Sequence, residues 1–481
     1  MNEPHCWSAT ETVEALRKRR IGAVELLDHM TARQQRLDGP LNAVIATDLD
    51  TARAAAQAAD KASAPLGPLH GLPMTIKETY DVTGFATTAG IPDLAHNRPT
   101  RDADAVARLR KAGAVIWGKT NVPVAAADHQ SVNPIYGLTC NPWDLERTPG
   151  GSSGGAAAAV AGGFTALELG SDIGGSIRLP AHFCGVWGLK PSYGIVSGRG
   201  HIPPGPGALA PSPLGVSGPL GRSAKDLSLA LDVLAGGGPG AWQLSLPASR
   251  HQRLADFRIA VWTGGYPVDT AYAAGIDSYA NSLAGQGAQV TVLDTMPSPL
   301  KGADDLYLKL LFAVLGAGSP PDEVAGYAAV AAAHPDIPIV QLIARSVTSS
   351  MADVAQLFEA QAQTIAAWDG WFKEYDAVLM PVSMGQAFPH MLGGGFGPVS
   401  KLPETLDVGG KPESYLKNLL WPGIATFAHL PAVACPIPGG INGLPAGVQI
   451  MGPAFGDRTV LKLAELCEEA VGGFTVPPGF E

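Results

Sequence analysis

The sequence predicts a layered α/β domain built around a central sheet. Residues 104–112 have a helical pattern and residues 114–117 that of a short buried strand, with Gly113 ending the helix between them. Similar changes between helical and strand patterning recur along the 481 residues. Of these residues 46% are hydrophobic and only 16% are charged, so the chain can bury a large core. Together these observations are typical of helices packed on a sheet.

The N-terminal elements follow from caps and periodicity. Ser8 and Glu11 form a capping-box pattern, which predicts a helix to about Arg19. A second amphipathic helix is expected after it, because apolar residues recur at helical spacing. The next elements are expected to be a strand at 41–46 and an alanine-rich helix at 51–62.

The later elements alternate in the same way and end in a hairpin. We expect helices at 156–161, 223–234, 350–372 and from residue 459 onward, and strands at 258–262, 289–293, 375–381 and 446–451. Asn442-Gly443 between two apolar runs predicts a tight hairpin turn. The glycine runs at 236–240 and 393–397 are expected to break the chain, the second as a mobile loop.

Charge and cysteine content exclude several classes of protein. The formal net charge of −10 argues against binding to a nucleic-acid backbone, which needs a clustered basic face. The five cysteines are scattered without a CxxC pair, so neither a disulfide framework nor a zinc site is expected. We see no signal-peptide pattern and no apolar run long enough to span a membrane. A cytoplasmic protein without nucleic-acid or membrane partners is therefore expected.

Ser176 follows two glycines in the segment Asp172-Ile-Gly-Gly-Ser-Ile-Arg178. A serine hydroxyl becomes a nucleophile only when a neighbouring base takes its proton. The glycines let consecutive backbone N–H groups converge on one point, which suits the negative oxygen of a tetrahedral intermediate. The same motif also fits a structural glycine turn, so it does not establish catalysis by itself.

A second serine turn, Gly150-Gly-Ser-Ser-Gly-Gly155, lies a short distance upstream. Its composition also fits a flexible linker. It is flanked, however, by Arg147-Thr-Pro149 and by an Ala/Val helix, whereas a linker would continue as polar low-complexity sequence. A phosphate-binding loop is disfavoured because no Gly-Lys-Ser/Thr follows.

Lys77 ends an apolar segment, Leu72-Pro-Met-Thr-Ile-Lys77, that is expected to be a buried strand. Most lysines are solvated surface charges. In a buried strand, however, desolvation lowers the pKa of a lysine, and only the neutral amine accepts a proton. Glu78 could instead pair with Lys77 and keep it charged.

Other polar residues are weaker candidates. The histidines, among them His129 and His201, show no metal-ligand spacing, so no metal catalysis is expected. Cys184 could act as a thiol nucleophile, but is expected to be a small packed residue. Two serines and a lysine therefore form the candidate machinery.

Taken together, these segments resemble the amidase signature family. The matching motifs are the two serine turns, Gly71-Leu-Pro-Met-Thr-Ile-Lys77, Gly118-Lys-Thr-Asn121, Asn141-Pro-Trp143, Gly188-Leu-Lys-Pro-Ser192 and Gly443-Leu-Pro-Ala-Gly-Val-Gln-Ile-Met-Gly452. The resemblance implies a single domain with a mixed central sheet covered by helices on both faces. Its expected parts are an N-terminal helical segment (1–65), a catalytic core (66–235), a variable substrate-pocket region (236–415) and the C-terminal part of the core (416–481).

The resemblance also implies a Ser-Ser-Lys triad, in which Ser176 is the nucleophile, Ser152 the bridging serine and Lys77 the base. A cis peptide bond is expected at Gly151–Ser152 or nearby. The oxyanion is expected to be held by the backbone amides of Ile173, Gly174, Gly175 and Ser176. Supporting roles fall to Ser153, Asp172 and Arg178, and substrate contacts to Ala126 and Gly151. No cofactor and no metal are implied.

The expected activity is that of a serine amidohydrolase that cleaves a linear amide through an acyl-enzyme. Where many family members have an acidic residue and phenylalanine, this chain has Val124-Ala-Ala-Ala127. These small residues, with Ile202-Pro-Pro204 and Phe396 as expected neighbours, favour a roomy apolar pocket for aryl or alkyl amides, with esters and carbamates as side substrates. The expected partner is the small-molecule amide alone, with a possible homodimer.

One alternative is the A subunit of a glutamyl-tRNA amidotransferase, which shares this core and supplies ammonia to a tRNA-bound substrate within a complex. The residues after Asn121 and the lack of an obvious charged set for recognising glutamine argue against it. A non-catalytic binding protein with the same fold is disfavoured, because all three triad positions are present. A cysteine amidase that uses Cys184 is the remaining alternative.

Overall fold

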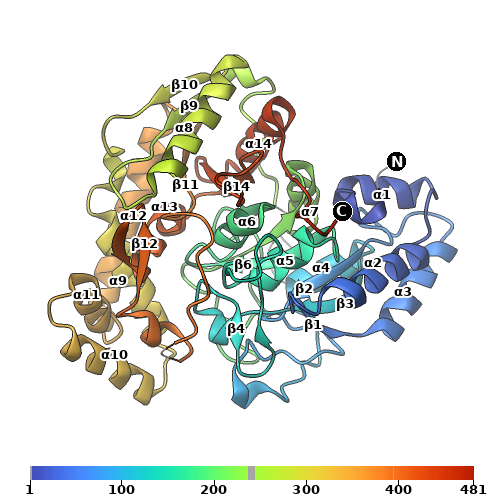
Figure 1. The fold of residues 1–481 in the computed structure, drawn as a ribbon, viewed down its shortest axis with the longest axis horizontal. Helices are drawn as coiled ribbons and strands as arrows, with labels where there is room; N and C mark the ends of the chain where they lie inside the picture. The colour runs from blue at the N-terminus through green and yellow to red at the C-terminus, as the bar shows by residue number, and fades with distance from the viewer. Residues whose placement is uncertain (1–2, 237–243, 394) are drawn as a thin grey trace.

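The computed structural model describes residues 3–236, 244–393 and 395–481, and one continuous eleven-stranded sheet forms its centre (Figure 1). In spatial order its strands are β1 (Val44–Thr47), β3 (Val115–Thr120), β2 (Pro73–Lys77), β6 (Leu167–Asp172), β8 (Val216–Gly221), β7 (Trp187–Lys190), β14 (Ala432–Pro436), β15 (Gly447–Met451), β11 (Ala377–Pro381), β9 (Arg258–Val261) and β10 (Gln289–Val292). Pairing is parallel along β3–β2–β6 and β11–β9–β10 and antiparallel elsewhere, so the sheet is mixed. Most of the predicted break at 236–240, and Gly394 of the predicted loop, lie outside the described residues.

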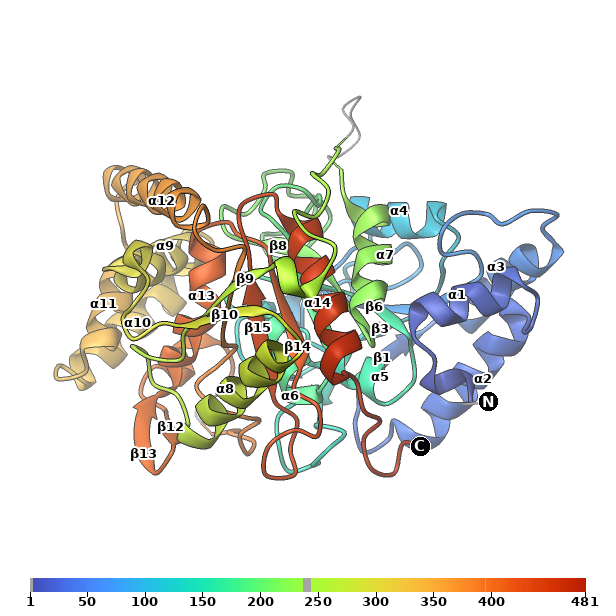
Figure 2. The same ribbon diagram turned by 90° about the horizontal axis from the view of Figure 1, so that it is seen from above.

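Helices cover both faces of this sheet, as Figure 2 shows from above. One face is covered by α1 (Ala9–Arg17), α4 (Asp104–Lys111), α7 (Ala224–Leu234), α8 (Thr270–Gly285) and α14 (Asp457–Val471). The other is covered by α2 (Ala23–Leu37), α3 (Leu49–Lys61), α5 (Gly154–Ala161), α6 (Arg178–Cys184), α9 (Ala303–Gly316), α12 (Met351–Trp371) and α13 (Leu420–Phe427). Two further helices, α10 (Pro321–Ala333) and α11 (Pro338–Ser346), extend this layer: α11 packs on α9, and α10 packs on α11.

Side chains of strand β11 show why both faces need a cover. Ala377 and Leu379 belong to the hydrophobic core beneath α8 and α14, whereas Val378 and Met380 belong to the core with α9, α12 and α13. All four are fully buried. Successive side chains of a strand point to opposite faces, so a strand covered on both sides is apolar throughout. The predicted fold class, a mixed sheet with helices on both faces, is therefore confirmed.

The N-terminal elements differ slightly from their expected bounds. The capping box is present, since Ser8 N donates to Glu11 Oε2 (2.8 Å) and Glu11 N donates to Ser8 Oγ (3.1 Å). Helix α1 ends at Arg17 rather than Arg19, because Arg19 has a left-handed φ of 52°. Strand β1 begins at Val44 because Asn42, with a φ of 53°, turns the chain just before it.

The predicted C-terminal hairpin is also present. Strands β14 and β15 pair antiparallel, with Cys435 opposite Val448. At the tip, Ile441 and Leu444 exchange two backbone hydrogen bonds of 2.9 and 3.1 Å. The residues between them, Asn442-Gly443, have φ angles of 51° and 80°, as a two-residue type I′ turn requires.

The middle third contains more helix than the sequence predicts. The expected helix at 350–372 is α12, but α8, α9, α10 and α11 were not predicted. A small hairpin of β12 (Thr405–Val408) and β13 (Lys411–Ser414) follows, and β4 (Val132–Asn133) pairs with β5 (Gly137–Leu138) beside the main sheet.

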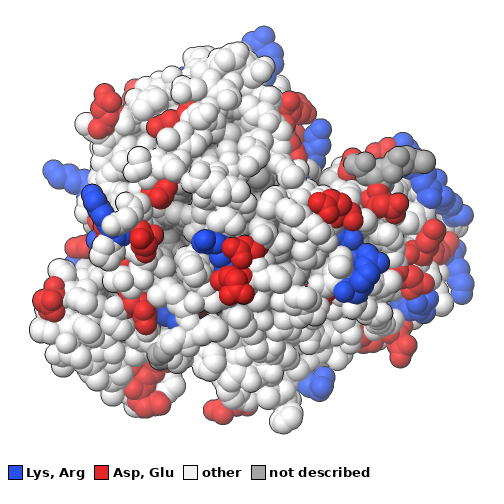
Figure 3. All heavy atoms as spheres, viewed as in Figure 1, with Lys and Arg blue, Asp and Glu red and all other residues white. Residues whose placement is uncertain are grey.

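One face of the molecule shows how the charged side chains are distributed. On the face shown in Figure 3, acidic and basic side chains are interspersed among uncharged ones and form no single-sign patch. Among the described residues, no helix is both long enough and apolar enough to cross a bilayer.

Arg222 joins three distant segments. Its buried guanidinium donates hydrogen bonds to the carbonyl oxygens of Trp7 (2.6 Å), Val160 (3.0 and 3.1 Å) and Thr165 (2.8 Å). The N-terminal segment, the end of α5 and the start of β6 are thereby held together.

Replacing Arg222 with alanine is expected to lower the free energy of unfolding by about 3 kcal/mol, because three carbonyl groups lose their buried donor. Urea denaturation followed by tryptophan fluorescence measures the change. The control is Arg458→Ala: Arg458 pairs with Asp232 on the surface (side chains 43% and 52% exposed), so the loss should stay below about 1 kcal/mol. Equal losses in both variants would contradict the role of Arg222.

Candidate active site

The predicted site residues meet at one edge of the sheet because β2 and β6 are parallel neighbours. Thr75 pairs with Glu168 and Ile76 with Leu169, so the two strands end side by side. Lys77 is the last residue of β2, and β6 ends nearby at Asp172. The turns that precede α5 and α6 carry Ser152 and Ser176 to the same place. Carboxyl ends of adjacent parallel strands are a common location for functional groups.

Lys77 is fully buried, and its amine is surrounded by serine oxygens. Its Nζ lies 2.7 Å from Ser152 Oγ, 2.9 Å from Ser171 Oγ and 3.4 Å from Ser171 O. Burial lowers the pKa of Lys77 to about 7, while electrostatic interactions with Asp172 and Glu168 act in the opposite direction. A substantial fraction of this amine is therefore neutral near pH 7, and position 77 is not a solvated surface lysine.

Glu78, the residue expected to compete for Lys77, contacts other groups. Its carboxylate accepts hydrogen bonds from the backbone amides of Thr88 (2.6 Å) and Ala89 (2.7 Å) and lies 3.9 Å from Lys119 Nζ. Neighbouring side chains at a strand end point in opposite directions, which separates Glu78 from Lys77.

The two serine turns are joined through the backbone. Ser153 N donates to Ser176 O (3.1 Å), and Ser153 Oγ donates to Ser171 O (3.3 Å). The Gly151–Ser152 peptide bond is cis, at the position that the family resemblance indicates. In the described part of the chain the hydroxyl of Ser176 has no hydrogen-bond partner, and the residue is 5% exposed. Lys77 and Ser152 are therefore hydrogen-bonded to each other. No hydrogen bond joins the hydroxyl of Ser152 to that of Ser176.

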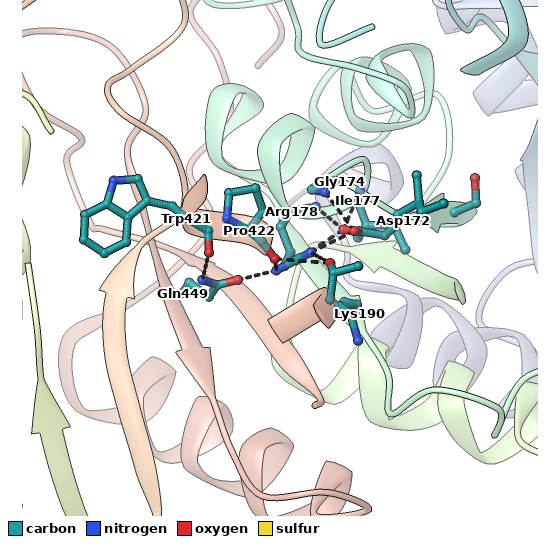
Figure 4. Close-up of polar contacts among 12 residues, drawn as sticks. Asp172, Gly174, Ile177, Arg178, Lys190, Trp421, Pro422 and Gln449 are labelled. Carbon is teal, nitrogen blue, oxygen red and sulfur yellow. Dashed lines mark hydrogen bonds and ion pairs between the residues drawn. The ribbon is translucent and has the colours of Figure 1, made fainter. Parts of the chain in front are cut away.

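Asp172 organises the turn that carries Ser176 (Figure 4). Its Oδ1 accepts from Gly175 N (2.9 Å) and its Oδ2 from Ile177 N (3.1 Å). Arg178 donates to both oxygens, at 2.8 and 3.0 Å. Burial alone would raise the pKa of this carboxyl, but the Arg178 charge and these hydrogen bonds hold it at about 2. Asp172 is therefore ionised across the physiological range.

Arg178 ties this turn to the C-terminal part of the sheet. Its guanidinium also donates to Pro422 O (2.8 Å), Thr426 Oγ1 (2.9 Å) and Gln449 Oε1 (2.5 Å). Figure 4 shows Arg178 between Asp172 on one side and Pro422 and Gln449 on the other. Sequence reasoning did not single out these partners. A visible signal was Gln449, a polar residue inside the otherwise apolar strand β15.

The backbone amides of the turn are not equivalent. Because the amide of Gly175 donates to Asp172, it is not free to bind an oxyanion, although it was expected to do so. The amides of Ile173, Gly174 and Ser176 have no partner among the described residues. Three of the four predicted donors are therefore available for a developing negative oxygen.

Gly175 cannot be another residue. Its φ is +97°, and a Cβ atom there would lie 2.4 Å from Leu179 Cδ1 and 2.8 Å from Pro422 Cβ. Substitution would strain the backbone and displace the α6 and α13 residues that pack beneath the turn.

Two buried side chains hold the carbonyl groups of this turn and were not predicted. His129 Nε2 is 3.0 Å from Gly174 O, and Tyr307 Oη donates to Ile173 O (3.1 Å). Burial lowers the pKa of His129 to about 4, so the ring is neutral and donates this hydrogen to the carbonyl. Because a carbonyl group and the N–H that follows it belong to one planar peptide group, holding these two carbonyls also fixes the direction of the N–H groups of Gly174 and Gly175.

The two predicted substrate contacts differ in their surroundings. Gly151 has no room for a side chain, because a Cβ atom would be 2.3 Å from Asp128 O. Ala126 is partly exposed, with a left-handed φ of 55°, in the short 3₁₀ turn Val124–Ala126. Contact of either residue with a substrate stays a prediction.

The loop around residues 385–400 is anchored at Met391, whose backbone forms two hydrogen bonds with the side chain of Gln130 (2.8 and 3.1 Å). Cys184, the alternative nucleophile, is fully buried, and burial raises the pKa of its thiol well above its usual value. Its Sγ lies 3.4 Å from Pro149 O, so Cys184 is a packed residue, as expected.

Among the described residues, one group of side chains could hold a metal ion: Glu3, His5 and His29. His5 Nδ1 and His29 Nε2 lie 3.2 Å apart and can hydrogen-bond directly. These residues belong to the N-terminal segment and α2 and are not part of the site around Lys77.

Asp172→Asn is expected to lower the free energy of unfolding by about 3–5 kcal/mol, because the buried guanidinium of Arg178 loses its counter-charge. The native pKa of Asp172 lies below its ordinary value of 3.8, so its contribution to stability is complete above about pH 4 and is lost as pH falls toward about 2. Denaturation midpoints from pH 3 to 7 measure both effects. Asp256→Asn, in a surface pair with Arg253, should leave the midpoints nearly unchanged; a similar change in both variants would refute the assignment.

With this geometry established, comparison with known proteins gives the family. A model of the family described as Amidase matches residues 25–461. The A subunit of glutamyl-tRNA(Gln) amidotransferase from Anaeromyxobacter sp. (strain K) is 32% identical over 95% of each chain, and that from Moraxella catarrhalis is 32% identical over 97% of each. A bacterial aryl acylamidase of the amidase signature family superposes with a TM-score of 0.79 at 26% identity, over 97% of this chain and 96% of that one.

These relatives correct two expectations. Several curated proteins that align nearly end to end with this chain are amidotransferase subunits, and this overturns the expectation of a free-standing hydrolase of linear apolar amides. They also overturn the expectation that the only partner is a small-molecule amide. The expectation of an apolar substrate rested on small residues such as Val124 and Ala126, which form one short turn. Such a local feature carries less weight for the function than similarity along the whole chain. Because the family model matches residues 25–461, this chain belongs to the amidase family of enzymes, which act on amide C–N bonds.

Proposed function

We propose that this chain is the amide-hydrolysing A subunit of a glutamyl-tRNA(Gln) amidotransferase, and that it releases ammonia from the side-chain amide of glutamine. The observation that carries the proposal is the buried amine of Lys77 beside Ser152, next to the turn of Ser176, in a chain that aligns nearly end to end with such subunits. The fold and the site geometry supply the chemistry, and the relatives supply the biological setting.

The proton relay starts at Lys77. The neutral amine accepts a proton from Ser152, which takes the proton of Ser176 as Ser176 Oγ attacks the amide carbon. The carbonyl oxygen becomes an oxyanion and accepts hydrogen bonds from the free amides of Ile173, Gly174 and Ser176. These donors are fixed before the reaction, so no reorganisation is needed as the charge develops.

The intermediate then collapses. The proton held by Lys77 returns through Ser152 to the leaving nitrogen, the C–N bond breaks, and ammonia departs. The acyl group remains as an ester on Ser176. A water molecule, activated by the same relay, attacks this ester, releases the carboxylate and restores the hydroxyl of Ser176. The sum is one amide and one water converted to one carboxylic acid and one ammonia, which at neutral pH become a carboxylate and an ammonium ion.

In this proposal, partner subunits bind the tRNA. The formal net charge of this chain is −10, and the face in Figure 3 has no clustered basic side chains. Binding to a phosphate backbone depends on such clusters. In the proposed assembly another chain contacts the nucleic acid and receives the ammonia.

The pH dependence tests the base. The kcat/KM for glutamine deamidation should rise between about pH 6 and 8, because Lys77, with a pKa of about 7, accepts a proton only when neutral. Lys77→Met and Ser176→Ala should each lower kcat by about 10³-fold or more, because each removes one member of a unit that acts together. Ammonia release measured with the purified protein gives both results.

Lys119→Met provides a matched control. Lys119 is also fully buried with a lowered pKa of about 8, but its amine contacts Ala86 O (2.7 Å) and Thr87 Oγ1 (3.1 Å), away from the serines. This variant should keep the rise in rate near pH 7. If Lys119→Met abolished that rise and Lys77→Met retained it, the assigned base would be wrong.

The amidotransferase setting has its own test. Tagged chain recovered from its native cells should co-purify with partner subunits and convert glutamyl-tRNA(Gln) to glutaminyl-tRNA(Gln) with glutamine. With Ser176→Ala, glutamine should no longer support this conversion, but added ammonium salt should restore it, because only ammonia production is lost. Recovery of the chain alone, active on glutamine but inactive on the charged tRNA, would refute the proposed assembly.

A further inference from the structure

His201 lies one hydrogen bond away from Ser171, which itself contacts Lys77. Its Nε2 is 2.8 Å from Ser171 Oγ, and its Nδ1 is 2.9 Å from Pro203 O. Ser171 Oγ in turn lies 2.9 Å from Lys77 Nζ. The ring of His201 packs edge-on against Tyr80, with 4.9 Å between the ring centres. The imidazole is thus held on three sides and joined to the amine through one hydroxyl.

The partners determine where each hydrogen lies. The carbonyl of Pro203 can only accept, so Nδ1 of His201 carries the hydrogen and Nε2 of the neutral ring is an acceptor. The hydroxyl of Ser171 must therefore donate to Nε2, which leaves its oxygen to accept from Lys77. A neutral ring agrees with its surroundings, because burial and the charge of Lys77 lower the pKa of His201 to about 3.

The consequence falls on the amine of Lys77. A neutral lysine amine has two hydrogens and one lone pair. One hydrogen is donated to Ser171 Oγ and the other is directed to Ser171 O, 3.4 Å away. The lone pair is left for the proton of Ser152, whose Oγ is 2.7 Å away. A Ser171 hydroxyl free to rotate could instead donate to this lone pair and compete with Ser152.

We propose that His201 is a positioning residue, which holds the Ser171 hydroxyl as an acceptor toward Lys77 and so reserves the lysine lone pair for Ser152. This inference rests on the proposed amide hydrolysis, in which Lys77 is the base. His201 touches neither the substrate nor the reacting atoms and acts only through Ser171. No ligand spacing in the sequence singled it out; the contact arises because the loop after β7 packs across the ends of β2 and β6.

The other titratable groups that face Lys77 and His201 come from neighbouring elements. Asp172 and Glu168 lie on β6 and raise the pKa of Lys77 against the effect of burial. Burial raises the pKa of Glu168 itself to about 8. Tyr80, from the segment after β2, packs on the imidazole ring. A substitution at His201 leaves these groups in place, so a change in the pH profile reports on the Ser171 contact.

Labelling by a fluorophosphonate tests the inference without glutamine or partner subunits. The second-order rate constant for modification of Ser176 is measured on the purified full chain from about pH 5.5 to 9. For the wild type it should rise as Lys77 loses its proton, near pH 7. For His201→Phe, which keeps a ring against Tyr80 but lacks the acceptor, the plateau should be about tenfold lower. The midpoint should also move to lower pH, because a hydroxyl that donates to the lone pair stabilises the neutral amine.

A double-mutant cycle separates this role from a general effect on packing. Ser171→Ala should also lower the plateau and the midpoint, because the amine loses its acceptor. If His201 acts through Ser171, adding His201→Phe to Ser171→Ala should change the rate by less than about twofold. His201→Gln, whose side-chain oxygen can accept from Ser171, should lie closer to the wild type than His201→Phe.

Each outcome has a definite meaning. If the wild type is not labelled, or labels equally in Ser176→Ala, the proposed mechanism fails before the inference is reached. If the wild type shows the expected rise and His201→Phe follows the same profile, the inference alone is wrong. It is also wrong if the two losses multiply in the double mutant. Should His201→Phe not fold, an unchanged pH midpoint in Ser171→Ala is enough to overturn it.

Discussion

The removal of one amine from water determines much of the chemistry of this site. Lys77 ends a strand buried on both faces, and desolvation favours its neutral form. An adjacent carboxylate would reverse that effect, and Asp172 is close enough to act on the amine. Arg178, however, holds both oxygens of Asp172 in a buried ion pair. The ion pair between Asp172 and Arg178 therefore has an electrostatic consequence as well as a structural one. Arg178 balances the charge of Asp172, and Lys77 keeps a pKa near neutrality.

This arrangement depends on contacts between distant parts of the chain. Parallel pairing of β2 with β6 brings Lys77 to the turn that carries Ser176, and Arg178 then joins that turn to Pro422 and Gln449, which lie more than two hundred residues later. The glycine turn before Ser176 can form without the hydrogen bonds from Arg178 to Pro422 and Gln449. The turn alone, however, does not supply enough acceptors for the guanidinium of Arg178 to be buried. The C-terminal strands complete the site because they supply the acceptors that the buried Arg178 requires.

The sequence predicts the parts of this fold that carry local signals. The capping box at Ser8, the Asn442-Gly443 turn and the two serine turns each require particular residues at fixed positions, and all of these elements are present. Helices α9 and α10 carry weaker signals. Acidic residues occupy the first turn of both and Pro321 begins α10, but neither helix has a side-chain cap, and the apolar residues lie all around each helix instead of along one side. His129 and Tyr307 were missed for a different reason. Their contacts with the turn at Gly174 and Ile173 span 45 and 134 residues, and only the folded chain brings them together.

The error about partners has a physical origin too. A net charge of −10 was the reason to expect no nucleic-acid partner, since binding to a phosphate backbone depends on clustered basic side chains. The net charge of one chain does not limit what an assembly containing the chain can bind, because a second subunit can supply the basic surface. The small residues at 124–127 misled in the same way, since they describe one short turn beside the site. The catalytic geometry arises instead from strand ends and buried hydrogen bonds, which an amidase can retain whether it acts alone or passes its ammonia to a partner.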